Sequence, residues 1–418
     1  MFSKFTINSV VLLALTVFSV AVAAIYRNPL VVYTAVFLVV TNIALFTWAQ
    51  LSVAGLTIRR RHPRFGVATQ PTEITIELVN ERRSPRYGTL GFDVHAQLTP
   101  GQDYTPVAFL DAPPQQPVLA DYTLVPQRRG VFRIGPFYLY GGDPFGFYKC
   151  WSRREQYSDL TVLPCPVAFS FRRPASISQL KQDEVETVPL SGDSTEFLGV
   201  RDYVEGEPLK RVHWRTSARI GRLISRQYEL NVAASLSALV LVDEPMLTGT
   251  RVDSPLEYSL TMVASLGYAT VSENFQFNYL AVMGDQHDIC AGTGRGFYEE
   301  LAVRLANLNQ LGPVDWESQG RVVLNYLPAG SHLIVFTADL GGKTRERLRQ
   351  LATRFRGLTA VTFNLDSFKH ARASQHAGPQ LVLGEGYLVL EVSYRDELSA
   401  VLAQCLSAPA MIGRQRWA

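Results

Sequence analysis

Two long apolar runs at the amino terminus constrain this chain more than any other feature. Residues 7–25 and 30–51 are each almost wholly apolar, and a helix needs about 20 such residues to cross a bilayer. Only Tyr26-Arg27-Asn28-Pro29 separates the two runs, which is the length of a tight turn. The sequence therefore predicts a transmembrane helical hairpin over residues 1–54.

A cleavable signal peptide is the alternative interpretation of the first run. Lys4, the apolar run and Ala21-Val22-Ala23 follow the charged, apolar and small-residue order of such peptides, and the second run would then be a stop-transfer anchor. The length of both runs favours the uncleaved hairpin. Arg59-Arg60-Arg61 and Arg64 follow the second run, and positive charge stays on the cytoplasmic side. Residues from about 55 onward are therefore expected in the cytosol in either case.

The segment after the hairpin has the pattern of a small all-β domain. Polar and apolar residues alternate over residues 73–79, and similar runs recur at 91–98, 122–125 and 130–140. Alternation with period two is typical of strands that bury one face, and turn residues separate the runs. We expect an immunoglobulin-like β-sandwich over residues 55–165.

From about residue 231 the pattern changes to alternating strands and helices. Residues 236–242 form a continuous apolar run that ends at Asp243, typical of a strand buried on both faces. Further strands are predicted over 278–283, 332–337, 360–363 and 387–392, and helices over 256–271, 297–311, 343–355 and 396–406. This succession predicts a doubly wound α/β domain with a mainly parallel sheet over residues 231–408, followed by a tail at 409–418.

Composition narrows the classes of function. The formal net charge of +3 does not suggest nucleic-acid binding as the main function. The four cysteines form no C-x-x-C pair, so they fit buried thiols in a reducing compartment and indicate no zinc framework. The chain has no G-x-S-x-G or H-E-x-x-H motif for hydrolase chemistry.

A basic segment lies within residues 166–230, between the two predicted domains. Six cationic residues and no Asp or Glu occupy the stretch from Lys210 to Arg226, with Trp214 in the middle. Runs of charge are commonly solvated faces paired with nearby carboxylates, whereas an aromatic residue among the cations favours a recognition surface. A short helix from about Pro208 and a strand over about 222–230 are predicted.

This segment resembles the signature of the bacterial family called domain of unknown function 58. The family's order of motifs, at matching spacing, falls on Glu196-Phe197, Arg201, Tyr203, Arg211, Trp214 and Ser217-Ala218-Arg219. Two positions depart from it, because Glu205-Gly206-Glu207 replaces a P-G-D turn and His213 replaces an acid. A weaker resemblance extends over nearly the whole chain.

The resemblance implies an architecture and partners, but no defined reaction. It implies a protein of the bacterial cytoplasmic membrane whose cytosolic part ends in a von Willebrand factor A-like domain. Family members commonly accompany MoxR-type AAA+ ATPases, often with a transglutaminase-like membrane protein. The implied function is a non-enzymatic adaptor with no cofactor, whose surface comprises Glu196, Phe197, Arg201, Tyr203, Arg211, His213, Trp214, Ser217 and Arg219. The alternative for these residues is a clasp between the two domains, in which Arg201, Arg211 and Arg219 pair with Glu196 and Glu207.

A von Willebrand factor A-like domain also implies a position for a divalent cation. Ligands of open α/β sheets lie at the carboxyl ends of strands, which points to Asp243, to Thr293 in the loop 292–296, and to Asp339. Oxygen ligands of this kind suit Mg²⁺. Both serines of the family's D-x-S-x-S motif are missing at 243–247, so the site is degenerate and no bound metal is expected. The alternative function is a magnesium-dependent hydrolase or nucleotide-binding enzyme at this edge.

Overall fold

The computed structural model describes most of the chain in two units. The described residues are 6–26, 28–99, 101–174, 197–203, 212–228, 235–250, 252–273, 275–308, 323, 325–328, 330–338, 340–370, 380–383 and 386–406. The first unit, called here the helix–sandwich unit, comprises Met1–Cys165 with Ala302–Asn309. The second, called the α/β unit, comprises Pro166–Leu301 with Gln310–Ala418.

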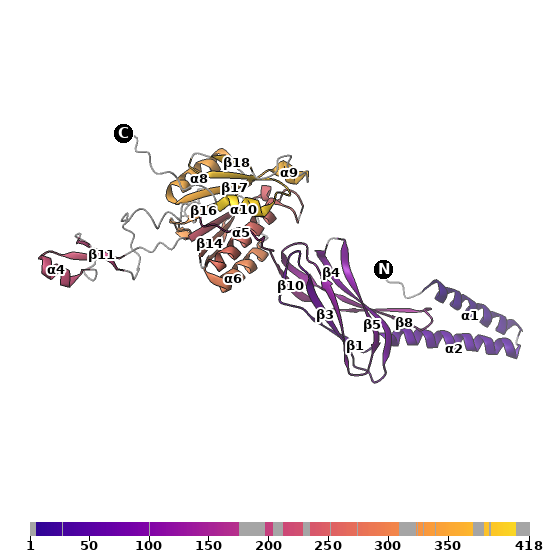
Figure 1. Cartoon of the computed structure of the whole chain (residues 1–418). Helices are drawn as coiled ribbons and strands as arrows, with labels where there is room; N and C mark the ends of the chain where they lie inside the picture. The colour runs from indigo at the N-terminus through magenta and orange to yellow at the C-terminus, as the bar shows by residue number, and fades with distance from the viewer. Residues whose placement is uncertain are drawn as a thin grey trace. The chain divides into compact units, whose positions relative to one another are not determined.

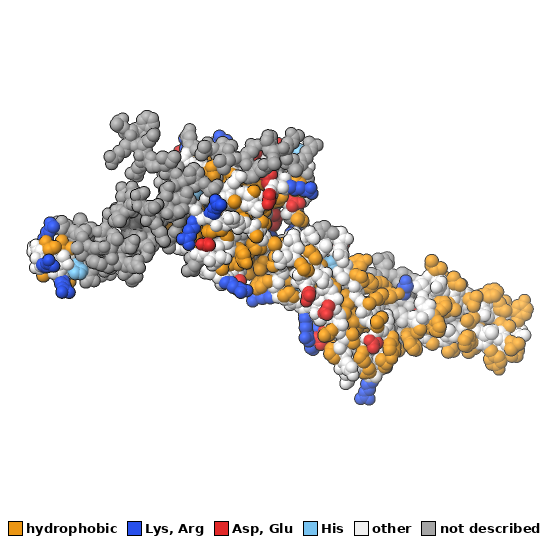
Figure 2. All heavy atoms as spheres, viewed as in Figure 1, with side chains coloured by type: hydrophobic (Ala, Val, Ile, Leu, Met, Phe, Trp, Pro, Cys, Tyr) orange, Lys and Arg blue, Asp and Glu red, His pale blue; other side chains and the backbone are white. Residues whose placement is uncertain are grey.

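Two apolar helices open the helix–sandwich unit. Helix α1 (Ile7–Tyr26) and helix α2 (Pro29–Ser52) lie side by side and run in opposite directions (Figure 1). Asn28 caps α2 by accepting a hydrogen bond from the Leu30 N–H, and Pro29 occupies the first helical position. Both helices are long and apolar enough to cross a membrane, and neither contains a charged residue. Hydrophobic side chains cover the face of the helices shown in Figure 2.

An immunoglobulin-like β-sandwich forms the rest of this unit. Three sheets have the strand orders β1-β3-β6, β2-β10-β7 and β5-β4-β8-β9. The strands are β1 (Leu56–Arg61), β2 (Phe65–Val67), β3 (Thr72–Asn80), β4 (Arg86–Thr99), β5 (Gln102–Ala112), β6 (Pro117–Leu124), β7 (Gly130–Ile134), β8 (Phe137–Gly142), β9 (Lys149–Arg154) and β10 (Ser158–Leu163). The apolar positions of the alternation read from the sequence lie in the core: Ile74, Ile76 and Leu78 of β3 are fully buried. Glu77 between them is also buried.

The α/β unit is built on a seven-stranded sheet with the order β15-β14-β13-β16-β17-β19-β18. The five central strands are parallel, and the two edge strands are antiparallel to their neighbours. The strands are β13 (Ser235–Leu241), β14 (Gln276–Met283), β15 (Gln286–Gly292), β16 (His332–Phe336), β17 (Gly357–Phe363), β18 (Gln380–Leu383) and β19 (Leu388–Val392). All seven residues of β13 are buried, as expected of a strand covered on both faces.

Helices cover the sheet. They are the 3₁₀ helix η3 (Glu244–Leu247) and the α-helices α5 (Pro255–Ser272), α6 (Gly294–Asn307), α8 (Gly342–Arg354), α9 (Leu365–Lys369) and α10 (Leu398–Leu406). The predicted fold class is confirmed: two long apolar helices, a β-sandwich and a mostly parallel α/β sheet.

Candidate functional site

The described part of the basic segment is a short helix between two paired strands. Strand β11 (Phe197–Asp202) pairs antiparallel with β12 (Ile224–Tyr228), and helix α4 (Trp214–Ile220) precedes β12. The predicted helix start at Pro208 lies outside the described residues, and the described helix begins at Trp214.

Both ends of α4 are fixed by local hydrogen bonds. The His213 Nδ1 accepts a hydrogen bond from the Thr216 N–H (3.2 Å), so His213 is the N-cap. Gly221 ends the helix in the left-handed conformation (φ 79°), and its N–H bonds the Ser217 carbonyl. The sequence suggested recognition as a role for His213, whereas the described geometry gives it a structural one.

A buried serine ties α4 to the strand that follows. The Ser217 Oγ donates to the His213 carbonyl (3.1 Å) and accepts from the Ile224 N–H (2.9 Å). The His213 N–H bonds the Ile224 carbonyl (2.8 Å), and the Tyr203 N–H bonds the Leu223 carbonyl (3.0 Å). These bonds satisfy backbone groups at the helix ends. The helix is therefore held in one orientation against β12.

The outer surface of α4 combines a large aromatic side chain with cations. Trp214 is 59% exposed, and Ile220 and Leu223 are also exposed. Arg215 and Arg219 are exposed on the same helix. Figure 2 shows blue and orange side chains side by side over this segment. An exposed Trp on a capped helix that also carries exposed arginines is typical of a protein-binding surface.

The structure brings together five of the nine predicted signature residues. Tyr203, His213, Trp214, Ser217 and Arg219 lie in or next to the α4–β12 turn. The backbones of Phe197 and Arg201 lie on β11, with Arg201 paired to Ser225. Glu196, Arg211 and Glu207 lie outside the described residues, and so do the ion pairs predicted for the clasp.

The second predicted site does not assemble as expected. Asp243 follows β13 at the carboxyl end of the parallel strands and precedes η3, but Thr293 lies at the opposite edge of the sheet. Strand β15 is antiparallel to β14, with Gly292 opposite Phe277 at the amino end of β14. The prediction that Thr293 lies with Asp243 is therefore wrong.

The physical reason is a tight hairpin that returns the chain without a crossover. Gly284 adopts a positive φ (59°) between Met283 and Gln286, as a two-residue hairpin turn requires. Asp339 lies outside the described residues. Among the residues that the structure describes, no group of three His, Cys, Asp or Glu side chains could hold a metal ion.

Comparisons with known proteins concern the β-sandwich. The CARDB domain of PF1109 from Pyrococcus furiosus, solved with di-metal ions, is 13% identical, covering 26% of this chain and 91% of that one (TM-score 0.20). The PKD domain of an M14-like peptidase from Thermoplasmatales archaeon SCGC AB-540-F20 is 10% identical over 25% and 91% (TM-score 0.17). Red sea bream transglutaminase is 14% identical over 25% and 14% (TM-score 0.20).

No protein-family model matches the chain. No curated protein matches it either. The solved structures share under 15% identity and score well below 0.5, so they carry no argument about function. The candidate site therefore has to be judged on its own geometry.

Proposed function

We propose that α1 and α2 remain in the mature protein as a transmembrane hairpin. Three hydrogen bonds tie the two helices and the residue before α1 to each other and to the loop between β8 and β9. The Thr6 Oγ1 donates to the Phe147 carbonyl (2.6 Å), the Asn42 Nδ2 donates to the Thr16 Oγ1 (2.6 Å), and the Tyr148 hydroxyl donates to the Asn42 Oδ1 (2.5 Å). A signal peptide destined for removal has no need of such contacts. Polar side chains within apolar spans usually face a protein partner.

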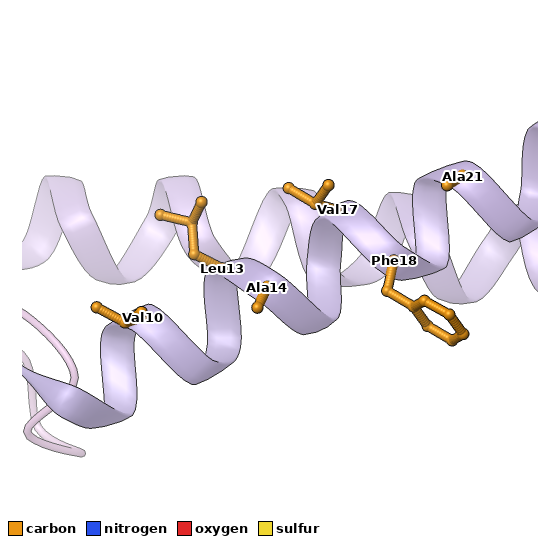
Figure 3. Close-up of a pocket in the computed structure, with 6 residues that line it drawn as sticks. All are labelled: Val10, Leu13, Ala14, Val17, Phe18 and Ala21. Carbon is orange, nitrogen blue, oxygen red and sulfur yellow. The ribbon is translucent and has the colours of Figure 1, made fainter.

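The outer face of α1 suits contact with lipid. An apolar furrow of about 640 Å³ runs along this helix and is lined by Val10, Leu13, Ala14, Val17, Phe18 and Ala21. Figure 3 shows that all six side chains come from α1, so acyl chains can fill the furrow. The arginines at 59–61 then put the β-sandwich and the α/β unit on the cytosolic side of a bacterial cytoplasmic membrane.

We propose that the protein is a membrane-anchored adaptor whose α4 surface binds a MoxR-type AAA+ ATPase and brings it to a client protein. The observation that carries the proposal is the exposed Trp214 on a helix that His213, Ser217 and Gly221 hold rigid. A rigid surface loses little conformational entropy on binding. Trp and Arg dominate binding energy at protein interfaces.

The chemistry of the surface indicates an acidic partner. Arg215 and Arg219 are exposed on the same short helix as Trp214, and guanidinium groups bind carboxylates in two-pronged fashion. The resemblance to the domain of unknown function 58 family supplies the identity of the partner, and it adds a transglutaminase-like membrane protein as a second component. The von Willebrand factor A-like identity of the α/β unit belongs to the same proposal. Nucleic acid is not a proposed ligand.

The magnesium-dependent enzyme is not favoured by any observation. Its proposed ligands included Thr293, which lies across the sheet from Asp243. Of the two acids proposed for this site, Asp243 alone lies among the described residues.

The proposal is tested by affinity purification of the tagged full-length chain in detergent, with ATP and Mg²⁺. We expect an AAA+ ATPase to copurify with the wild type and recovery to fall about tenfold or more in Trp214→Ala, the loss typical of a central interface residue. Tyr326→Ala, a change at an exposed tyrosine in the α/β unit, is the control. Equal recovery with Trp214→Ala and the control would count against the α4 surface.

A further inference from the structure

A groove of about 1140 Å³ lies where the end of α2 meets the β-sandwich. One wall is the last two turns of α2, and the other comes from the start of β4 and the loop between β8 and β9. In Figure 1, β8 lies beside α2, as their contacts also indicate. The residues used below are Trp48, Leu51, Arg86, Tyr87, Asp143 and Tyr148.

The loop between β8 and β9 reaches well along the apolar helices. Tyr148 bonds Asn42, which lies ten residues before the end of α2 at Ser52, or about 15 Å along a helix. The Tyr148 ring also packs edge-on against Phe46 (5.6 Å between ring centroids). Phe145, at the tip of this loop, is 73% exposed. An exposed Phe beside a membrane helix is best accommodated by lipid.

The groove therefore opens at the depth of the lipid headgroups on the cytosolic side. Trp48 and Leu51 of α2 and Tyr87 of β4 are exposed there. Trp and Tyr are enriched at this level of a bilayer, where one end of the ring is apolar and the other is wet. This placement rests on the transmembrane hairpin proposed above.

One cation in the groove has an unused hydrogen-bond donor. The Arg86 Nε is buried and makes no hydrogen bond to the described residues, a state that costs free energy. The Arg86 side chain as a whole is partly exposed and lines the groove. Asp143 also lines the groove, but its two carboxylate oxygens accept the N–H groups of Phe145 (2.9 Å) and Tyr148 (2.5 Å). The Asp143 charge is thus stabilised within the loop, whereas the partly exposed Arg86 has no counter-ion among the described residues that line the groove.

We propose that this groove binds one membrane phospholipid, with the phosphate on Arg86 and an acyl chain along Trp48 and Leu51. A guanidinium group above an apolar wall matches a phosphate joined to a hydrocarbon chain, because the fork of N–H donors fits phosphate oxygens. A sterol offers no phosphate, and a second copy of this chain would need an acid at the same position. The chemistry of the groove therefore best fits a glycerophospholipid.

Native mass spectrometry of the full-length chain, titrated with short-chain phosphatidylglycerol, tests the ligand. We expect one lipid per wild-type chain, and affinity about tenfold to a hundredfold lower in Arg86→Gln, as for loss of a charge-assisted hydrogen bond. Arg83→Gln removes an exposed charge three residues away and should match the wild type. Diacylglycerol, which lacks the phosphate, should bind as weakly to the wild type as phosphatidylglycerol binds to Arg86→Gln. Equal affinity in Arg86→Gln and the wild type, or equal binding of diacylglycerol, would overturn the proposal.

Photo-crosslinking in native membranes needs no charge substitution and so does not depend on Arg86→Gln folding. A benzophenone amino acid is placed at Tyr87, and the control is placed at Tyr104; these residues lie at opposite ends of the same β4–β5 ladder. We expect a phospholipid adduct at position 87 and none at 104. If carbonate extraction releases the chain from membranes, the transmembrane anchoring is refuted, and the lipid site that depends on it is refuted too. A chain that resists carbonate but forms no adduct at 87 would refute the lipid site alone.

Discussion

The most quantitative prediction concerns an ion pair buried inside the β-sandwich. Arg60 of β1 donates to both carboxylate oxygens of Asp93 in β4, including Nε to Oδ2 at 2.8 Å, and the two side chains are 2% and 0% exposed. The Tyr122 hydroxyl of β6 donates to the same carboxylate (2.7 Å). Burial, with Asp93 nearby, raises the pKa of Tyr122 well above its usual value, so this hydroxyl stays a donor. The cluster joins strands from two sheets.

The change to make is Asp93→Asn, which keeps the shape of the side chain and removes its charge. Arg60 would then be a buried cation without a counter-ion, and removing one partner of a buried pair costs about 3–5 kcal/mol. The matched control is Arg153→Gln. Arg153 of β9 pairs with Glu155, and both side chains are exposed (51% and 72%); such surface pairs contribute about 0–1 kcal/mol.

Hydrogen–deuterium exchange on full-length protein in detergent reads the opening free energy of the sandwich separately from the other unit. For Asp93→Asn we expect exchange in β3 and β4 to quicken by about a hundredfold or more, since about 1.4 kcal/mol corresponds to tenfold. Arg153→Gln should change it by less than about fivefold. If the two variants exchange at similar rates, the buried pair does not stabilise the sandwich as argued.

Three further predictions concern the α/β unit and the α4 segment. Burial lowers the pKa of His332 to about 4. Between about pH 6.5 and pH 4 the His332 side chain is protonated in the unfolded chain but not in the folded chain, so the free energy of unfolding should fall as the pH drops through this range. The melting temperature of the wild type should therefore fall with pH over this range, and that of His332→Asn should fall less. The same pH dependence in both proteins would contradict the lowered pKa of His332. Ser217→Ala leaves the buried Ile224 N–H without its acceptor, at a cost of about 1–3 kcal/mol. Hydrogen–deuterium exchange over residues 212–228 should therefore quicken in Ser217→Ala and stay nearly unchanged in the control Thr216→Ala. Equal exchange in the two variants would refute the role of Ser217. Added Mg²⁺ should not stabilise the wild type more than it stabilises Asp243→Ala, and a rise in melting temperature confined to the wild type would restore the metal hypothesis.

Periodicity located most elements because burial repeats along each of them. The apolar run 236–242 is β13 (Ser235–Leu241), and the helix predicted over 343–355 is α8 (Gly342–Arg354). Strand β15 was missed because it lies at an edge of the sheet, where its residues are only partly buried. The Gly284-Asp285 pair between two strand-like runs was the signal that could have found it.

The candidate site was partly visible in the sequence. The residue types of α4 indicated a surface, but the role of His213 depends on the Thr216 N–H and on backbone geometry at the helix start, which no spacing rule specifies. The lipid groove was not predictable, because Trp48, Arg86 and Tyr148 come from three elements far apart in the chain. Their juxtaposition follows from packing of the sandwich against α2.

Binding of an AAA+ ATPase to the α4 surface is measured by mass spectrometry of the proteins that copurify with the tagged full-length chain, with and without ATP and Mg²⁺. We expect an AAA+ ATPase to be recovered with the wild type and lost with Trp214→Ala, whose side chain is exposed in the structure. If the wild-type chain purifies without an ATPase under both conditions, the α4 surface does not bind one as proposed.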